Sequence, residues 1–354
     1  MKTLVPSFIV QNQMNGRYSG ELTAVAIQID LSGFTQLTNT IMDQDRDSGG
    51  EIVANLIRDA FSPLIDLVEK QNGFVGMFAG DAFTAFFPIA HEPKEKVLHR
   101  ALTTVWQMSQ YIEFTRFSPP FTEVQFQFKI KIGMGLGQIF WRIFPTPDDG
   151  HQAHETRRTV YSFNGEGLTQ AITAVNMSRT DDVTLSTNLA HQLLEFIDIT
   201  PHPDSADFSL VVALKKAIPP SAANQFGQII DVPPEAARPF VPQALQDKAA
   251  EGEFRQVVSL FIGVHTPLET LDQLAPLVNL IYELQLTYGG YLNAVRFGDK
   301  GVVLVMFWGA PTALEQSTFR ASNFAHVLNL RSPYTLRLGL SYRWLYAGLS
   351  LIHI

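Results

Sequence analysis

The chain has 354 residues, which is more than one ordinary hydrophobic core requires and favours two domains. Its 46% apolar and 17% charged residues are typical of a globular protein, and the absence of cysteine excludes disulfides and thiolate metal sites. A net charge of −8 provides no basic surface for nucleic acid, and no segment is apolar for long enough to span a bilayer. We therefore expect a folded cytoplasmic protein without nucleic-acid partners or a membrane segment.

The first half of the chain predicts strands and helices in a regular order. An apolar strand over 22–30 precedes a helical pattern over 51–70, which we expect Pro63 to kink. Residues 73–88 are typical of two strands joined by a tight turn. A second helix is predicted over 94–114.

A strand over 126–136 completes a β-α-β-β-α-β order. Polar and apolar residues alternate in it, with Lys129 and Lys131 on one face, and Gly137 is predicted to turn the chain into another strand. This order favours an α+β fold, in which a ferredoxin-like antiparallel sheet has helices packed on it, over a doubly wound parallel sheet.

The second part of the sequence repeats the first. After a proline-rich stretch, VVSLFIGV at 257–264 matches the first strand, and residues 288–311 match the strand-turn-strand unit. The repeat stops early, so we expect its domain to be incomplete at the C-terminus. The predicted division is an N-terminal extension, a first domain, a connector and a second domain: 1–19, 20–200, 201–252 and 253–354.

Two aspartates of the first copy follow apolar strands. Asp30 ends the first strand, and Asp81 lies in the turn between the next two. These strands can be neighbours in a ferredoxin-like sheet, so the carboxylates can converge on one edge. Like charges at short range require a shared cation or proton, and oxygen ligands of this kind suit Mg²⁺ or Mn²⁺. An ordinary N-cap and an ordinary hairpin turn explain the same residues, and the pattern alone leaves both interpretations open.

The turn after Asp30 strengthens the metal interpretation. Its residues Ser32, Gly33, Phe34 and Thr35 should present backbone N–H groups at a helix N-terminus, where phosphates can bind. A carboxylate pair beside an anion-binding turn predicts two-metal phosphoryl chemistry.

Three ordered motifs resemble the class III nucleotide cyclases: IDLSGFT at 29–35, MFAGDAFTAFF at 77–87 and KIKIGMGLGQI at 129–139. The tandem layout is similar to that of soluble adenylyl cyclases and bacterial cyclase–ATPase fusions. The resemblance implies a pseudo-dimer of two cyclase domains with an active site between them. It also implies fusion to a C-terminal ATPase or repeat region.

Residue roles follow from the same resemblance. Asp30, Asp81 and the backbone carbonyl of Leu31 would hold two Mg²⁺ or Mn²⁺ ions, while the turn from Ser32 to Thr35 would hold the phosphates of ATP, with GTP left open. The 3′-hydroxyl of ATP would attack the α-phosphorus and release pyrophosphate, giving cyclic AMP for signal transduction. No catalytic residue beyond the metal ligands is implied.

The second copy departs from the family pattern. Ala294 stands where the partner domain has a purine-contacting lysine, with Arg296 and Lys300 as nearby candidate substitutes, and Gly263 replaces the first aspartate. The family's transition-state asparagine and arginine would lie beyond residue 354 in the second copy, and in the first copy their positions fall on Thr169 and Thr173. We therefore expect this chain alone to be inactive or weakly active. The alternative function is a degenerate regulatory module that binds nucleotide or dimerises and controls a C-terminal effector.

Two arginines precede the strand VYSF of the first copy. Arg157 and Arg158 could reach a phosphate or an acidic partner. A solvated turn is the favoured interpretation.

Overall fold

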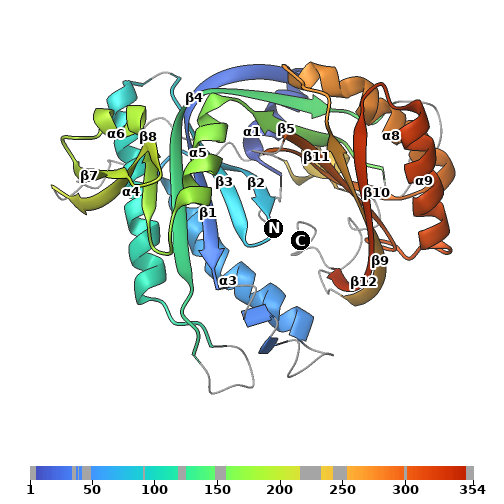
Figure 1. The fold of residues 1–354 in the computed structure, drawn as a ribbon, viewed down its shortest axis with the longest axis horizontal. Coiled ribbons are helices and arrows are strands. Elements are labelled where there is room, and N and C mark those ends of the chain that lie inside the picture. Colours follow the sequence, from blue (N-terminus) through green and yellow to red (C-terminus); the bar gives the residue numbers. More distant parts are fainter. Residues whose placement is uncertain are drawn as a thin grey trace. The chain divides into compact units, whose positions relative to one another are not determined.

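The computed structural model describes most of the chain as strands and helices. The described residues are 5–33, 37, 38, 40, 41, 49–90, 92–118, 125–147, 157–215, 233–241, 253–298 and 301–347. They form a mixed α+β protein, as predicted, with largely antiparallel sheets in which β4 and β6 pair in parallel (Figure 1). No helix in these residues combines the length and apolar character needed to cross a bilayer.

The elements up to residue 214 include those of the first repeat. In chain order they are α1 (Ser7–Met14), β1 (Ser19–Ser32), α3 (Gly49–Lys70), β2 (Phe74–Ala79), β3 (Ala82–Pro88), α4 (Lys94–Phe114), β4 (Lys129–Phe144), β5 (Val160–Asn164), α5 (Glu166–Met177), β6 (Val183–Ser186), α6 (Thr187–Gln192), β7 (Ile197–His202) and β8 (Ser205–Leu214).

The remaining elements belong to the connector and the second repeat. They are η1 (Pro234–Phe240), β9 (Glu253–Val264), η2 (Leu271–Leu274), α8 (Ala275–Tyr288), β10 (Tyr291–Gly298), β11 (Gly301–Trp308), α9 (Ser317–Arg331) and β12 (Leu336–Ala347).

These elements form two compact units that do not coincide with the two repeats. The first unit comprises 21–139 and 165–231, and the second comprises 1–20, 140–164 and 232–353. The end of β4 and the whole of β5, which belong to the first repeat by sequence, are therefore part of the second unit.

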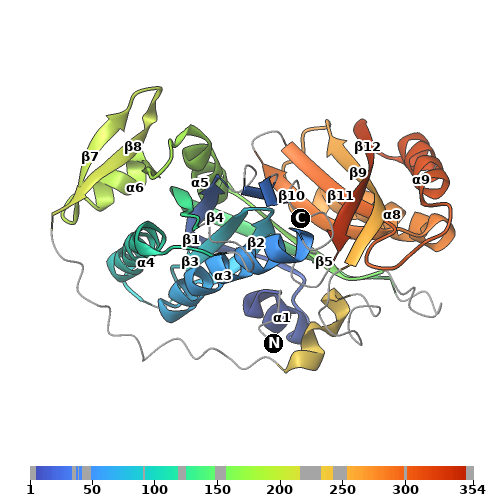
Figure 2. The same ribbon diagram turned by 90° about the horizontal axis from the view of Figure 1, so that it is seen from below.

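The first unit has its strands in the order β2-β3-β1-β4-β6-β8-β7. Strand β1 is an interior strand between β3 and β4, and its run from Ala24 to Ile27 is fully buried. Helices α3 and α4 pack side by side along β2 and β3 (Figure 2). The predicted helices 51–70 and 94–114 are confirmed, and α3 continues through Pro63.

The prediction of a turn at Gly137 is wrong, because β4 runs without interruption from Lys129 to Phe144. The glycine serves close packing instead. A Cβ on Gly137 would lie 2.9 Å from the backbone nitrogen of Gly167 in α5, and one on Gly133 would lie 2.2 Å from the carbonyl oxygen of Ala171. The glycines of the GxGxG pattern therefore let α5 pack closely against β4.

Strands also occupy the beginning of the range that the sequence assigns to the connector, 201–252. Strand β8 pairs with β6 and β7, so the sheet extends to Leu214. Pro201 is compatible with this pairing because β7 is an edge strand of the sheet, where a missing N–H is tolerated.

The second unit contains a four-stranded sheet in the order β10-β11-β9-β12, with α8 and α9 packed on it. The corresponding order in the first repeat is β2-β3-β1-β4. Both repeats thus place the same strands side by side, which confirms the internal repeat predicted from sequence.

Candidate functional site

The structure brings Asp30 and Asp81 to one edge of the first unit. Asp30 lies in β1 opposite Ala82, the first residue of β3, and Asp81 occupies the two-residue turn just before it. The backbone N–H of Leu31 donates to the carbonyl oxygen of Asp81 with an N–O distance of 2.9 Å. In the same turn Gly80 has φ +65°, a conformation that L residues rarely adopt.

The two carboxylates interact electrostatically. Burial and the negative charge of Asp30 raise the pKa of Asp81, against smaller opposing effects of its backbone hydrogen bond and of Lys131. The Lys131 ammonium lies 3.4 Å from a carboxylate oxygen of Asp30. The edge therefore holds two acids with one cation beside them, and a positive charge bound there would relieve their repulsion.

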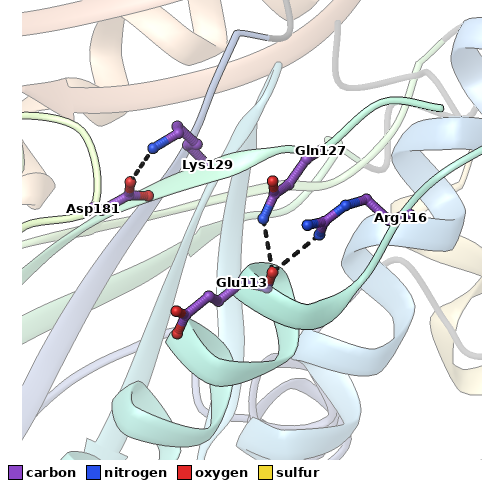
Figure 3. A network of polar contacts seen from close by, with 5 residues as sticks. All are labelled: Glu113, Arg116, Gln127, Lys129 and Asp181. Atoms are coloured by element: carbon purple, nitrogen blue, oxygen red, sulfur yellow. Dashed lines mark hydrogen bonds and ion pairs between the residues drawn. The ribbon is translucent and has the colours of Figure 1, made fainter. Parts of the chain in front are cut away.

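Lys131 is a residue of this edge that sequence reasoning did not place there. Its face of β4 was predicted together with Lys129, but Lys129 forms an ion pair with Asp181 instead (Figure 3). The order of the strands could have identified Lys131. Because β4 is the neighbour of β1, a residue of β4 must lie beside Asp30.

Figure 3 shows what the neighbouring residues of Lys129 do. The side chains of Gln127 and Arg116 both donate to the backbone carbonyl oxygen of Glu113, at 2.7 and 3.1 Å. These bonds satisfy a carbonyl group at the C-terminal end of α4.

The turn after β1 is described in part. Gly33 has φ +91° with open space where a Cβ would be, and the Ser32 hydroxyl is buried with no hydrogen-bond partner in the described part of the chain. A buried hydroxyl without a partner is expected to be compensated by a ligand or water. Phe34 and Thr35, the other predicted phosphate contacts, lie outside the described residues.

The donor set fits a small, oxygen-preferring cation. Within the described ranges no cluster of three or more His, Asp or Glu residues surrounds a common point. Mg²⁺ sites in phosphoryl-transfer proteins use one or two carboxylates and complete the shell with substrate phosphates and water. Asp30 and Asp81 meet that requirement when a triphosphate is present.

Comparison with known proteins adds an independent observation. A scan against models of protein families gives no match. Adenylate cyclase type 10 of Oryctolagus cuniculus is 29% identical over 167 residues, and that of Homo sapiens is 28% identical over 185 residues. These matches cover 46% and 51% of the chain but 9% and 10% of those proteins.

The chain is similar to class III nucleotide cyclases in sequence over about half of its length, and in fold. A crystal structure of a class III adenylyl cyclase-like ATP-binding protein from Pseudomonas aeruginosa is 13% identical and has a TM-score of 0.56. The likeness covers 94% of this chain and 80% of that one, and at this identity it supports the fold.

The second repeat carries the remaining candidate residues. Arg296 lies on β10, and burial lowers the pKa of its guanidinium. Ala294 precedes it on the same strand, and Gly263 lies in β9 opposite Val303. Lys300 is outside the described residues.

We expect Asp81→Asn to stabilise the protein in buffer without divalent ions. The raised pKa means that ionised Asp81 opposes folding at pH 7, whereas well below its usual pKa of 3.8 the carboxyl is protonated in the folded and unfolded chains alike. The variant should melt about 1–3 °C above wild type at pH 7, and this difference should shrink as the pH falls and vanish at about pH 2.5. Thermal melts across this pH range measure it, and a lower melting temperature at pH 7 would contradict the repulsion.

Proposed function

We propose that the chain is the nucleotide-binding part of a cytoplasmic adenylate cyclase that forms cyclic AMP and pyrophosphate from ATP. The convergence of Asp30 and Asp81, with Lys131 beside them, supports this function. Relatedness to class III cyclases supports the same reaction class.

Each residue of the edge has a role in this proposal. Asp30, Asp81 and the Leu31 carbonyl would hold two Mg²⁺ or Mn²⁺ ions, and Lys131 would neutralise charge on the phosphates once the ions compensate the carboxylates. When bound, the ions would lower the pKa of the attacking 3′-hydroxyl and stabilise the departing pyrophosphate. The unpartnered hydroxyl of Ser32 would donate to a phosphate oxygen.

The second repeat would supply contacts to the purine from β10. Arg296 is the candidate on that strand, and Lys300 is the candidate in the turn that follows it. Both residues differ from the lysine that contacts the purine in the family. The preference for ATP over GTP is therefore tested by comparing the binding of the two nucleotides.

One observation favours a second function, that of a regulatory module which binds nucleotide without converting it. Ala294 has no polar group to contact a base, and Gly263 has no carboxylate to form a second metal site. Such a module would retain nucleotide binding and control a C-terminal effector.

We expect the purified chain to bind ATP in the presence of Mn²⁺ and to produce little cyclic AMP. The α5 helix carries Thr169 and Thr173, whose short uncharged side chains cannot stabilise the pentavalent phosphate as a guanidinium does. Calorimetric titration with ATP and GTP, followed by chromatography of cyclic products, tests this. Absence of binding would refute the proposal, stronger binding of GTP would change the substrate, and rapid turnover would show that another residue supplies the missing stabilisation.

A further inference from the structure

Arg158 binds the backbone of β10 within the second unit. Its Nε donates to the carbonyl oxygen of Leu292 at 3.2 Å, and one terminal nitrogen donates to that of Asn293. The other terminal nitrogen donates to the carbonyl oxygen of Phe240 at 3.1 Å, and the guanidinium lies 4.9 Å from the ring centroid of Tyr291. Instead of lying in a solvated turn, this arginine donates hydrogen bonds to β10, an edge strand of the four-stranded sheet.

The carbonyl groups that Arg158 binds belong to a β-bulge. The pairing of β10 with β11 shifts register between Leu292 and Ala294, so Asn293 is the extra residue. The shift changes which side chains share a face. Leu292 and Val295 both belong to the core, whereas Ala294 and Arg296 lie on the opposite face.

The first repeat has the same irregularity at the matching place. Its β2–β3 pairing shifts between Val75 and Met77, and the extra residue there is Gly76. In the second repeat the extra residue is Asn293, which is 4% exposed and whose side-chain oxygen has no hydrogen-bond partner in the described part of the chain. The second bulge therefore buries a larger polar residue than the first, and Arg158 donates a hydrogen bond to the backbone carbonyl oxygen of that residue.

The segment that carries Arg158 is fixed on the second repeat by further bonds. The Tyr282 hydroxyl oxygen of α8 lies 2.9 Å from the carbonyl oxygens of Phe144 and Arg158. The Ser162 hydroxyl donates to the carbonyl oxygen of Val295 at 2.9 Å. Side chains of this segment thus satisfy three backbone carbonyl groups of β10, those of Leu292, Asn293 and Val295.

We propose that Arg158 is a positioning residue for base recognition. By holding the carbonyl groups of Leu292 and Asn293, it maintains the bulge that orients Ala294 and Arg296 to the face opposite the core. This inference rests on the proposed function, in which β10 contacts the purine, and it assigns a site-forming role to a residue remote from the carboxylate pair in sequence.

The test separates base binding from phosphate binding. Arg158→Ala should weaken ATP binding in the presence of Mn²⁺ about 10-fold, and leave binding of Mn²⁺-tripolyphosphate, which lacks a base, within about twofold of wild type. Arg158→Lys should not restore ATP binding, because an ammonium cannot bridge two carbonyl groups in the planar geometry of a guanidinium.

Arg142→Ala is the matched control. Arg142 lies in the same segment, and its ion pair and hydrogen bond in the described part of the chain are with Asp272 of η2 instead of with β10. The inference predicts unchanged binding of both ligands by this variant. It is overturned if Arg158→Ala binds ATP normally, loses tripolyphosphate in parallel, or is reproduced by Arg142→Ala. A wild-type protein that binds neither ligand would instead refute the proposed function.

Discussion

Asp30→Asn and Asp81→Asn should each remove at least about two thirds of the rise in melting temperature that ATP with Mn²⁺ gives the wild-type protein. A ligand at about 100 times its dissociation constant stabilises the folded state by about 2.7 kcal/mol, or roughly 5–10 °C for a chain of this size. Each substitution removes one of the charges that hold the ions, so affinity should fall at least about 30-fold. Differential scanning fluorimetry with and without the ligand measures the effect.

Asp207→Asn provides the control for this experiment. Asp207 is exposed on β8 and belongs to the same unit, so its replacement removes a carboxylate without touching the edge. It should retain the full shift. A shift that persists undiminished in both edge variants would show that the ions bind elsewhere, and the cyclase proposal would fall with it.

Gly133→Ala should destabilise the first unit strongly. The added Cβ would lie 2.2 Å from the carbonyl oxygen of Ala171 and 2.5 Å from the nitrogen of Val175, which are backbone atoms of α5 that cannot rotate away. Separation of β4 from α5 should cost about 3 kcal/mol or more of the free energy of unfolding. Urea denaturation followed by circular dichroism measures it.

The second repeat offers a matched glycine. Gly339 occupies the corresponding place in β12, and no described heavy atom lies within 4 Å of where its Cβ would be. Gly339→Ala should therefore change the free energy of unfolding by less than about 0.5 kcal/mol. Equal losses in the two variants would mean that strand conformation, rather than the contact with α5, makes Gly133 necessary.

The part of the site that could be predicted from sequence is local in the chain. Asp30 follows an apolar run and Asp81 follows Gly80, so periodicity and turn chemistry were enough to place the first near the end of a strand and the second in a turn. Their convergence then required only the β-α-β-β-α-β order. The glycines of β4 were misinterpreted because a glycine that permits a turn and one that permits close packing look the same in sequence.

The remaining residues depend on contacts between distant segments. Lys131 acquires its role from the pairing of β4 with β1, and Arg158 from a strand more than a hundred residues away. Arg158 follows a polar stretch, and its polar surroundings in sequence favoured solvent. Its true partners are backbone carbonyl groups, which every residue has and which therefore leave no mark in the sequence.

Segments of the first part of the chain fold with the second repeat, and this limits how the two repeats can be recombined. Because 1–20 and 140–164 fold with 232–353, a chimaera joined at the proline-rich stretch would combine β10 of one parent with the β4–β5 segment of the other. The guanidinium and the carbonyl groups that it binds would then come from sequences that had not changed together. Grafting the second repeat into a homologue intact would require transplanting the β4–β5 segment along with it.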